Sequence, residues 1–241
     1  MNRATIYQQL KDALSNEIEK HTLSGHLLSV RCRALSAREA IGVPDHDDYP
    51  IIKGREVMVE ADFLGARGQA FADEFENADY RVDDLLTMNL DSNSKRASFV
   101  SGLNAVYRHL NLCEKTIHCK DNEPKLCADN LNSVLGSAKK VFLVGYQPRF
   151  LEKLSKHHNL RVVDMDQDNI GNEVAGLTIE APGKTPEIIE WCDLIFATGS
   201  TVVNGTIDQF LNQGKPVWFY GVTIAATATI LNLNRYCDCG H

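Results

Sequence analysis

Short apolar runs separated by helix-like segments fill the chain from about Ala138 onward. Each run has four or five residues and is bounded by polar or glycine positions, which predicts strands buried on both faces. The predicted strands are 141–144, 160–163, 193–197 and 216–220, and the predicted helices begin at 148, span 185–191 and 207–212, and begin at 224. Strands that alternate with helices pair in parallel, so this region predicts a doubly wound, Rossmann-like α/β sheet.

The residues before this region follow a different pattern. Apolar residues at helical spacing predict an opening helix, namely Ile6, Leu10, Ala13, Leu14 and Ile18. Alternating stretches at 27–37 and 56–63 predict antiparallel strands with turns at Gly65 and Gly68, and two more helices are expected at 81–90 and 94–110. We therefore expect an α+β domain at 1–112, a cysteine-containing connecting segment at 113–137 and the Rossmann-like domain at 138–241.

Charge and composition limit the classes of partner. The 241 residues carry a net charge of −7, which argues against a nucleic-acid backbone as partner. The first sixteen residues lack the apolar core of a secretory signal, and seven cysteines in a chain of this size suit a reducing compartment, so we expect a cytoplasmic protein. The uncharged stretch 216–234 divides into a strand and a short helix, so no membrane span is expected. We expect a homodimer, because this is the commonest assembly among soluble oligomeric proteins.

Polar and glycine residues follow several of the predicted strands. In a doubly wound sheet, ligands bind beyond the carboxyl ends of the strands. The ligand-binding candidates are Gly145, Tyr146, Asp164, Asp166, Asn169, Thr198, Gly199, Ser200, Thr201, Asn204, Thr206 and Thr223. The Thr/Gly loop would offer backbone N–H groups to a carboxylate or other anion, and Asp164 or Asp166 would accept hydrogen bonds or bind a cation. The competing interpretation of 198–206 is a turn followed by an N-cap at Asn204.

Two familiar motifs do not fit these strand ends. The loop after the first strand has one glycine, Gly145, where a dinucleotide loop needs three, so NAD is not expected. The Asp-x-Asp-x-Asp string from Asp164 resembles a calcium loop, but Asn169 and Ala175 occupy the positions that require Gly and Glu.

Cysteine and histidine gather in the connecting segment and at the end of the chain. Thiolate and imidazole together suit zinc, copper and other soft metals, so a transition metal ion is the expected cofactor. The metal-ligating candidates are His118, Cys119, Cys127 and Cys237, while Cys239, His241 and His46 are weaker ones. The spacing matches no finger motif, and reactive thiols are the alternative. Cys32 and Cys192 are expected to be buried small apolar residues.

Three acids in the N-terminal region share strand parity. Glu56, Glu60 and Asp62 therefore lie on one face, either as a solvated edge or as the N-terminal contribution to a cation site.

Four strings carry a family resemblance: Gly102-Leu-Asn-Ala105, Val141-Phe-Leu-Val-Gly145, Asp164-x-Asp166-x-x-Asn169-Ile-Gly171 and Ala197-Thr-Gly-Ser-Thr-Val-Val-Asn-Gly-Thr206. With them, most of the chain resembles the family named putative heavy-metal chelation. The resemblance implies an N-terminal domain similar to the small cap domain of enolases, a Rossmann-like C-terminal domain and an active site between them. The resemblance does not imply enolase chemistry, because enolases carry their catalytic residues in a barrel that this chain lacks.

These observations support one leading hypothesis and two others. The leading one is a protein that binds a heavy metal or metal complex in a cleft between the two domains. The second is an enzyme acting on a small nucleoside-type cofactor, such as a methyl-donor-dependent transferase. The third is a non-catalytic ligand sensor.

Overall fold

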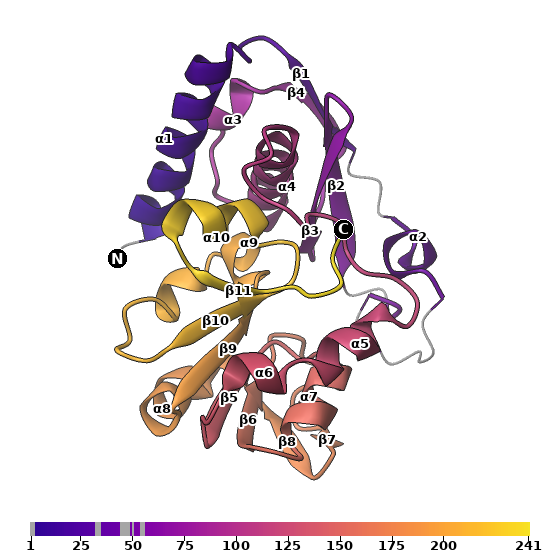
Figure 1. Cartoon of the computed structure of the whole chain (residues 1–241), viewed down its shortest axis with the longest axis vertical. Coiled ribbons are helices and arrows are strands. Elements are labelled where there is room, and N and C mark those ends of the chain that lie inside the picture. Colours follow the sequence, from indigo (N-terminus) through magenta and orange to yellow (C-terminus); the bar gives the residue numbers. More distant parts are fainter. Residues whose placement is uncertain (1–2, 32–34, 44–48, 50, 54–55) are drawn as a thin grey trace.

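The computed structural model describes residues 3–31, 35–43, 49, 51–53 and 56–241. It contains two sheets, which lie at opposite ends of the molecule in Figure 1. The interpretations of Cys32 and His46 concern positions outside the described residues.

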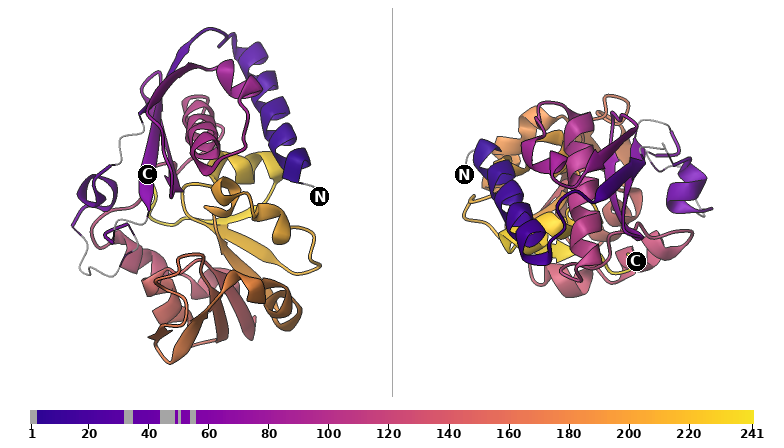
Figure 2. Two further views of the ribbon diagram at one scale, coloured as in Figure 1. Left: turned by 180° about the vertical axis from the view of Figure 1, so that it is seen from behind. Right: turned by 90° about the horizontal axis from the view of Figure 1, so that it is seen from above.

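The first sheet has four antiparallel strands in the order β3-β2-β1-β4. They are β1 (Leu27–Arg31), β2 (Val57–Phe63), β3 (Ala66–Ala72) and β4 (Ala78–Arg81). The helices of this part are α1 (Arg3–His21), α2 (Ala37–Ile41), α3 (Asp84–Thr87) and α4 (Asn93–His109). Helix α4 packs against the sheet, and α1 lies on the far side of α4, as both views show (Figures 1 and 2).

Helix α4 approaches β3 very closely at Gly68. A Cβ atom on Gly68 would lie 2.3 Å from the backbone nitrogen of Ala105 and 2.4 Å from the carbonyl oxygen of Ser101. Gly68 therefore lies inside a strand, and the prediction of a turn there is wrong. The residue is glycine because the helix backbone fills the space of a side chain.

The second sheet has seven strands in the order β11-β10-β9-β5-β6-β8-β7, and all neighbours except β7 and β8 are parallel. The strands are β5 (Lys140–Val144), β6 (Asn159–Val163), β7 (Glu173–Val174), β8 (Leu177–Glu180), β9 (Leu194–Thr198), β10 (Val217–Tyr220) and β11 (Asn234–Tyr236). Strand order reverses at β5, because β6 follows it on one side and β9 on the other. The predicted α/β class with a parallel sheet is confirmed.

Apolar helix faces cover both sides of this sheet. The helices are α5 (Glu123–Asp129), α6 (Asn132–Leu135), α7 (Pro148–Leu154), α8 (Thr185–Trp191), α9 (Thr201–Asn204) and α10 (Ala225–Leu231), with 3-10 turns at η1 (Pro182–Lys184) and η2 (Ile207–Gln209). One face packs Val141 and Leu143 against α5–α7, and the other packs Phe142 and Ile195 in a core that continues to α1 and α4. In the described part of the chain, no helix combines the length and apolar character that a membrane span requires.

Asn104 on α4 joins the two sheets. Its side-chain Nδ2 donates to the carbonyl oxygens of Gln69 (3.0 Å), Val222 (3.3 Å) and Thr223 (3.1 Å), and its Oδ1 accepts from the N–H of Ala226 (2.9 Å). The side chain is fully buried. One amide therefore fixes strand β3 relative to the loop that connects β10 to α10.

Several predicted elements differ from the structure. The expected helix at 81–90 is a strand end followed by the single turn α3, because Arg81 pairs with Leu27 and Met88 is extended. The expected helix at 207–212 is only the 3-10 turn η2. The loop at 198–206 contains the short helix α9. Strands β3, β4, β7, β8 and β11 were not predicted.

Candidate functional site

A cavity of about 730 Å³ lies between the two sheets, at the carboxyl ends of β5, β6, β9 and β10. All predicted ligand-binding and metal-ligating residues except Gly199 line it. The structure thus brings the strand ends and both cysteine segments to one cavity. That these residues bind a ligand stays a prediction.

Asp164 organises the loops at the ends of β5 and β6. Its Oδ2 accepts from the N–H of Tyr146 (2.6 Å), and its Oδ1 accepts from the N–H of Asp166 (2.8 Å) and from Nδ2 of Asn169 (3.3 Å). The N–H of Phe150 is bonded to the side chain of Gln147, the N-cap of α7. The N–H groups of Tyr146 and Phe150 are therefore already hydrogen-bonded within the protein and are not free to donate to a phosphate.

The Thr198 loop is held by its own hydroxyls. Thr201 Oγ1 donates to the carbonyl oxygen of Thr198 (2.9 Å), and Thr198 Oγ1 donates to Ser200 Oγ (3.3 Å). Gly199 lies behind the cavity wall, where a Cβ would come within 2.9 Å of the nitrogen of Ile224. Thr223 lines the cavity, but its Oγ1 accepts a hydrogen bond from the N–H of Phe71 (3.1 Å). Thr223 therefore also helps to join the two sheets.

Two acids of the N-terminal part face the same cavity. Glu56 precedes β2 and Asp73 follows β3, so these neighbouring strand ends bring both carboxyl groups near Asp164 and Asp166. Burial, followed by the charges of Asp164, Asp166 and Asp73, raises the pKa of Glu56 to about 7. A carboxyl group with such a pKa inside a cavity is typical of functional sites.

The other acids that share strand parity with Glu56 do not line the cavity. Glu60 accepts from Nε2 of Gln69 (2.7 Å) and Asp62 accepts from the N–H of Gly65 (3.1 Å). Strand parity identified Glu56 as a candidate, whereas Asp73 carried no sequence signal, since its place depends on the pairing of β3 with β2.

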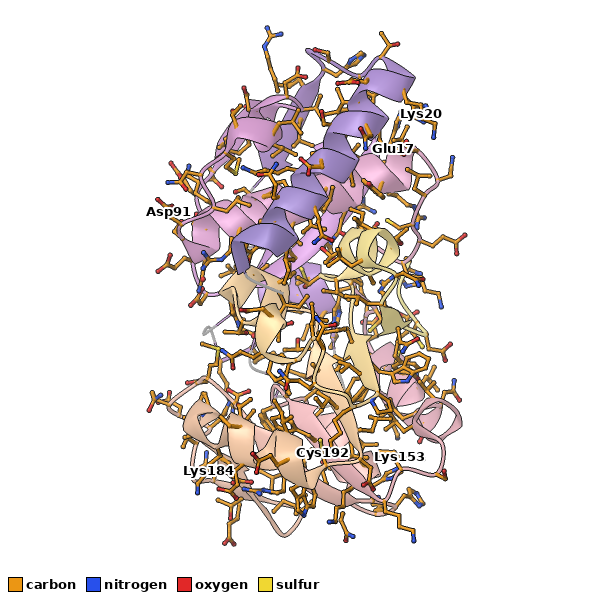
Figure 3. The ribbon with its side chains drawn as sticks, turned by 90° about the vertical axis from the view of Figure 1, so that its left-hand side faces the viewer. Glu17, Lys20, Asp91, Lys153, Lys184 and Cys192 are labelled. Carbon is orange, nitrogen blue, oxygen red and sulfur yellow. The ribbon has the colours of Figure 1, made fainter. Side chains whose placement is uncertain are left out.

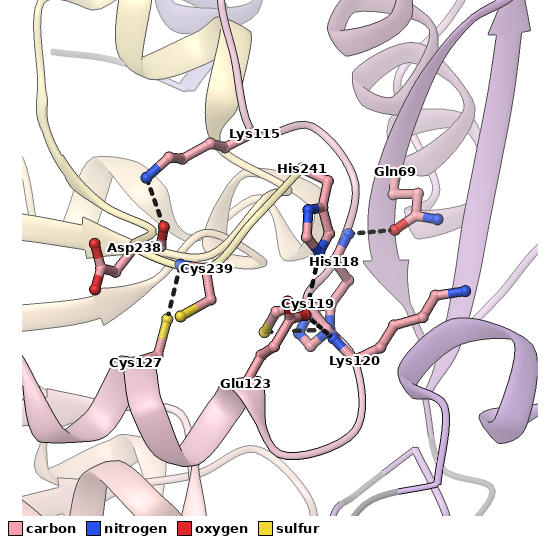
Figure 4. Close-up of polar contacts among 10 residues, drawn as sticks. All are labelled: Gln69, Lys115, His118, Cys119, Lys120, Glu123, Cys127, Asp238, Cys239 and His241. Atoms are coloured by element: carbon pink, nitrogen blue, oxygen red, sulfur yellow. Dashed lines mark hydrogen bonds and ion pairs between the residues drawn. The ribbon is translucent and has the colours of Figure 1, made fainter.

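The sulfur side of the cavity is assembled from three segments (Figure 4). Cys119 lies in the loop before α5, Cys127 lies on α5, and Cys237 follows β11. The N–H of Cys239 donates to Sγ of Cys127 (3.2 Å), so the last residues of the chain lie against α5. His241 adds a contact to Glu123 at 3.1 Å.

The thiols of this group differ in their pKa values, and so in how readily they lose a proton. The neighbouring Cys119 thiol and the N–H of Cys239 both stabilise the ionised form of Cys127 and lower its pKa. The hydrogen bond between the Cys119 and Cys127 thiols, together with burial, raises the pKa of Cys119. Burial raises the pKa of Cys237. Among Cys119, Cys127 and Cys237, Cys127 therefore loses its proton most readily.

His118 has one ring nitrogen committed. Its Nδ1 lies 2.6 Å from the carbonyl oxygen of Cys119, which can only accept, so Nδ1 carries the proton and Nε2 the lone pair. Burial lowers the pKa of His118, which keeps the ring neutral. Among the described residues, no three His, Cys, Asp or Glu side chains already converge tightly enough to hold a metal ion.

Aromatic side chains form much of the remaining wall. They are Tyr49, Phe71, Tyr146, Phe150, Phe210, Tyr220 and Tyr236. Of the described residues that line the cavity, none is Lys or Arg. Apart from Tyr146, sequence patterns did not identify these aromatic residues, because their apolar positions look the same as core positions.

The C-terminal part of the chain matches a known protein family. Residues 129–233 match the family DUF364, described as putative heavy-metal chelation, which confirms the resemblance expected from the sequence. No curated protein matches the chain.

Two crystal structures of DUF364 proteins of unknown function have a similar fold. One is from Pyrococcus horikoshii, with 15% identity, a TM-score of 0.53, and coverage of 90% of this chain and 79% of that chain. The other is from Desulfitobacterium hafniense DCB-2, with 13% identity, a TM-score of 0.51, and coverage of 73% and 72%. At these identities the likeness shows the fold alone.

Proposed function

Since residues 129–233 match the heavy-metal chelation family, we propose that this chain binds a soft metal ion, or a small complex of one, in the cavity between its two sheets. The observation that carries the proposal is the cysteine–histidine group. Segments that are far apart in the sequence contribute Cys119, Cys127, Cys237 and His118 to one wall. Sulfur and imidazole donors are the set that soft metals prefer.

Each of these side chains has a distinct part in the proposed site. Cys127 is the first ligand, because its lowered pKa lets it release its proton to a metal most readily. Cys119 and Cys237 lose their protons to the incoming metal, and the Nε2 atom of neutral His118 supplies a nitrogen ligand. Cys119 and Cys237 lie in loops, so rotation of their side chains can complete a ligand set that is not yet convergent.

The two sheets have complementary parts in this proposal. Residues 138–241 supply the strand ends that face the non-metal part of a complex, residues 113–137 supply most of the soft ligands, and residues 1–112 act as a cap over them. A reducing compartment such as the cytoplasm would keep the thiols available.

Cys127→Ala is expected to weaken the binding of cadmium and zinc by about tenfold or more, because it removes the thiol that loses its proton most readily. Cys119→Ala is expected to weaken it less. Competition with a chromophoric chelator measures the affinities, and ultraviolet thiolate-to-cadmium absorption reports the bonds directly. Cys192→Ala is the matched control, because Cys192 is buried at the end of α8, outside the cavity (Figure 3).

Equal affinities for wild type, Cys127→Ala and Cys192→Ala would overturn this ligand assignment. Thermal stabilisation by an adenosyl cofactor, with none by metal salts, would favour the nucleoside-cofactor enzyme instead. Tight binding of a metal complex without turnover of any substrate would identify a sensor.

A further inference from the structure

The proposed thiol ligands do not explain the acidic part of the cavity lining. Four acids form it, and they come from both sheets: Glu56, Asp73, Asp164 and Asp166. The charges of the three aspartates act on Glu56 and help to raise its pKa. Since none of the described lining residues is Lys or Arg, this side has a negative potential that no basic side chain on the described wall offsets.

The spacing of these acids disfavours a bare metal ion as the guest. A divalent ion needs several oxygen ligands within about 2.0–2.6 Å. Among the described side chains, no three acids converge to that extent. An organic cation with several hydrogen-bond donors does not require such tight convergence of its acceptors, so it suits these acids better than a bare metal ion.

Unused hydrogen-bonding capacity in the same wall also indicates a polar guest. The hydroxyl of Thr185 lines the cavity and the residue is only 5% exposed, yet within the described part of the chain it has no hydrogen-bond partner. Asn169 is 4% exposed and donates from Nδ2 to Asp164, while its carbonyl oxygen has no donor among the residues described. Neither oxygen is sealed inside the protein, so both remain accessible from the cavity, where a donor on a polar ligand can bond to them.

The aromatic residues complete the recognition surface. Phe150, Tyr220 and Tyr236 pack edge to face, with Phe150 5.1 Å from Tyr220 and 6.3 Å from Tyr236 between ring centroids. Arg149 lies over the ring of Tyr49 at 5.9 Å but pairs with Glu152 at 3.1 Å, and it does not line the cavity. Aromatic faces attract both apolar groups and organic cations.

We propose that the acidic side of the cavity binds the protonated amine of an organic ligand, with Glu56 and Asp166 facing the ammonium group and the aromatic wall holding the apolar body. This inference deepens the proposed function, because it names the organic part of the complex that the same cavity would take. The ammonium donates its three hydrogens to the carboxylates of Glu56 and Asp166 and to the Thr185 hydroxyl. No bond is made or broken in this step.

Three probes that share one phenyl body test the proposal in the absence of metal. They are phenethylammonium, 2-phenylethanol and 3-phenylpropionate, and titration calorimetry or ligand-observed NMR gives their affinities. We expect the ammonium to bind about tenfold tighter than the alcohol, and the carboxylate to bind more weakly than both. Equal affinity for all three, or preference for the carboxylate, would overturn the proposal.

Variants locate the binding to this wall. Glu56→Gln and Thr185→Val are expected to weaken phenethylammonium binding by about five- to tenfold, with little effect on 2-phenylethanol. Glu74→Gln is the matched control, because Glu74 is exposed and lies outside the cavity next to Asp73. If Glu56→Gln and Glu74→Gln have equal effects, binding is non-specific and the assignment fails.

The same samples separate this inference from the proposed function. Cadmium affinity depends on Cys127 and is measured without the amine, whereas amine affinity depends on Glu56 and is measured without metal. Loss of amine selectivity with intact cadmium binding overturns only the ammonium site, and the reverse result overturns only the thiol site.

Discussion

Asn104→Ala is expected to lower the free energy of unfolding by about 3–5 kcal/mol, because it leaves several buried backbone groups without partners. The amide of Asn104 contacts the carbonyl oxygens of Gln69, Val222 and Thr223 and the N–H of Ala226, and water cannot replace it at a fully buried position. Each unsatisfied buried group costs about 1–3 kcal/mol. The removed side chain also leaves a void next to α4.

Urea unfolding followed by far-ultraviolet circular dichroism measures this loss. Asn89→Ala is the control, since Asn89 is exposed and its side chain bonds to the exposed Asp91, so its removal should change the stability by less than about 0.5 kcal/mol. Because the groups that Asn104 holds belong to both sheets, the variant should also weaken the binding of any cavity ligand. A loss below about 1 kcal/mol would show that the two sheets do not depend on this amide.

Continuous apolar strands made the parallel sheet predictable from the sequence. The runs at 141–144 and 160–163 lie in β5 and β6, and the predicted helix at 185–191 has the bounds of α8. These elements are buried on both sides, so their patterns do not depend on which neighbour covers them. The rule that ligands bind beyond the carboxyl ends of parallel strands then identified most of the strand-end residues that line the cavity.

The missed elements depend on contacts that are remote in sequence. Strand β3 contains Gly68, which local pattern indicates as a turn but which packs under the backbone of α4. Strand β11 is a short edge strand next to β10, and β4 is defined only by its pairing with β1. In each case the backbone conformation is fixed by tertiary pairing rather than by local preference.

The two sides of the cavity differed in how well the sequence indicated them. The rarity of Cys and His made the sulfur side visible, although spacing alone did not show that Cys237 would lie on the same wall as Cys127. Asp73 and most of the aromatic wall became visible only with the fold, because surface acids and core aromatics are common and carry no signal of their own.

Glu56→Gln is expected to stabilise the protein at alkaline pH by about 1–3 kcal/mol while leaving its stability near pH 4.5 almost unchanged. The pKa of Glu56 is raised in the folded state from 4.5 to about 7, whereas in the unfolded chain it stays near the ordinary value. Between these two values the folded protein holds a proton that the unfolded chain has released, so the stability contributed by this group falls as pH rises through that window. One pKa unit corresponds to about 1.4 kcal/mol. The expected difference in stability is smaller than the full pKa shift would give, because Glu56 is only half-buried and solvent screens its charge.

Unfolding measured from pH 4.5 to 8.5 tests this linkage. The difference between Glu56→Gln and wild type should grow with pH and level off above about pH 7, because glutamine stays neutral whereas Glu56 ionises beside Asp73, Asp164 and Asp166. Glu74→Gln should show no such trend, since Glu74 is exposed. A cationic guest should reverse the order, because it offsets the repulsion among the acids in wild type but gains less from the glutamine variant. If the Glu56→Gln difference stays flat across this range, Glu56 does not share the field of the three aspartates, and the acidic side of the cavity loses its central group.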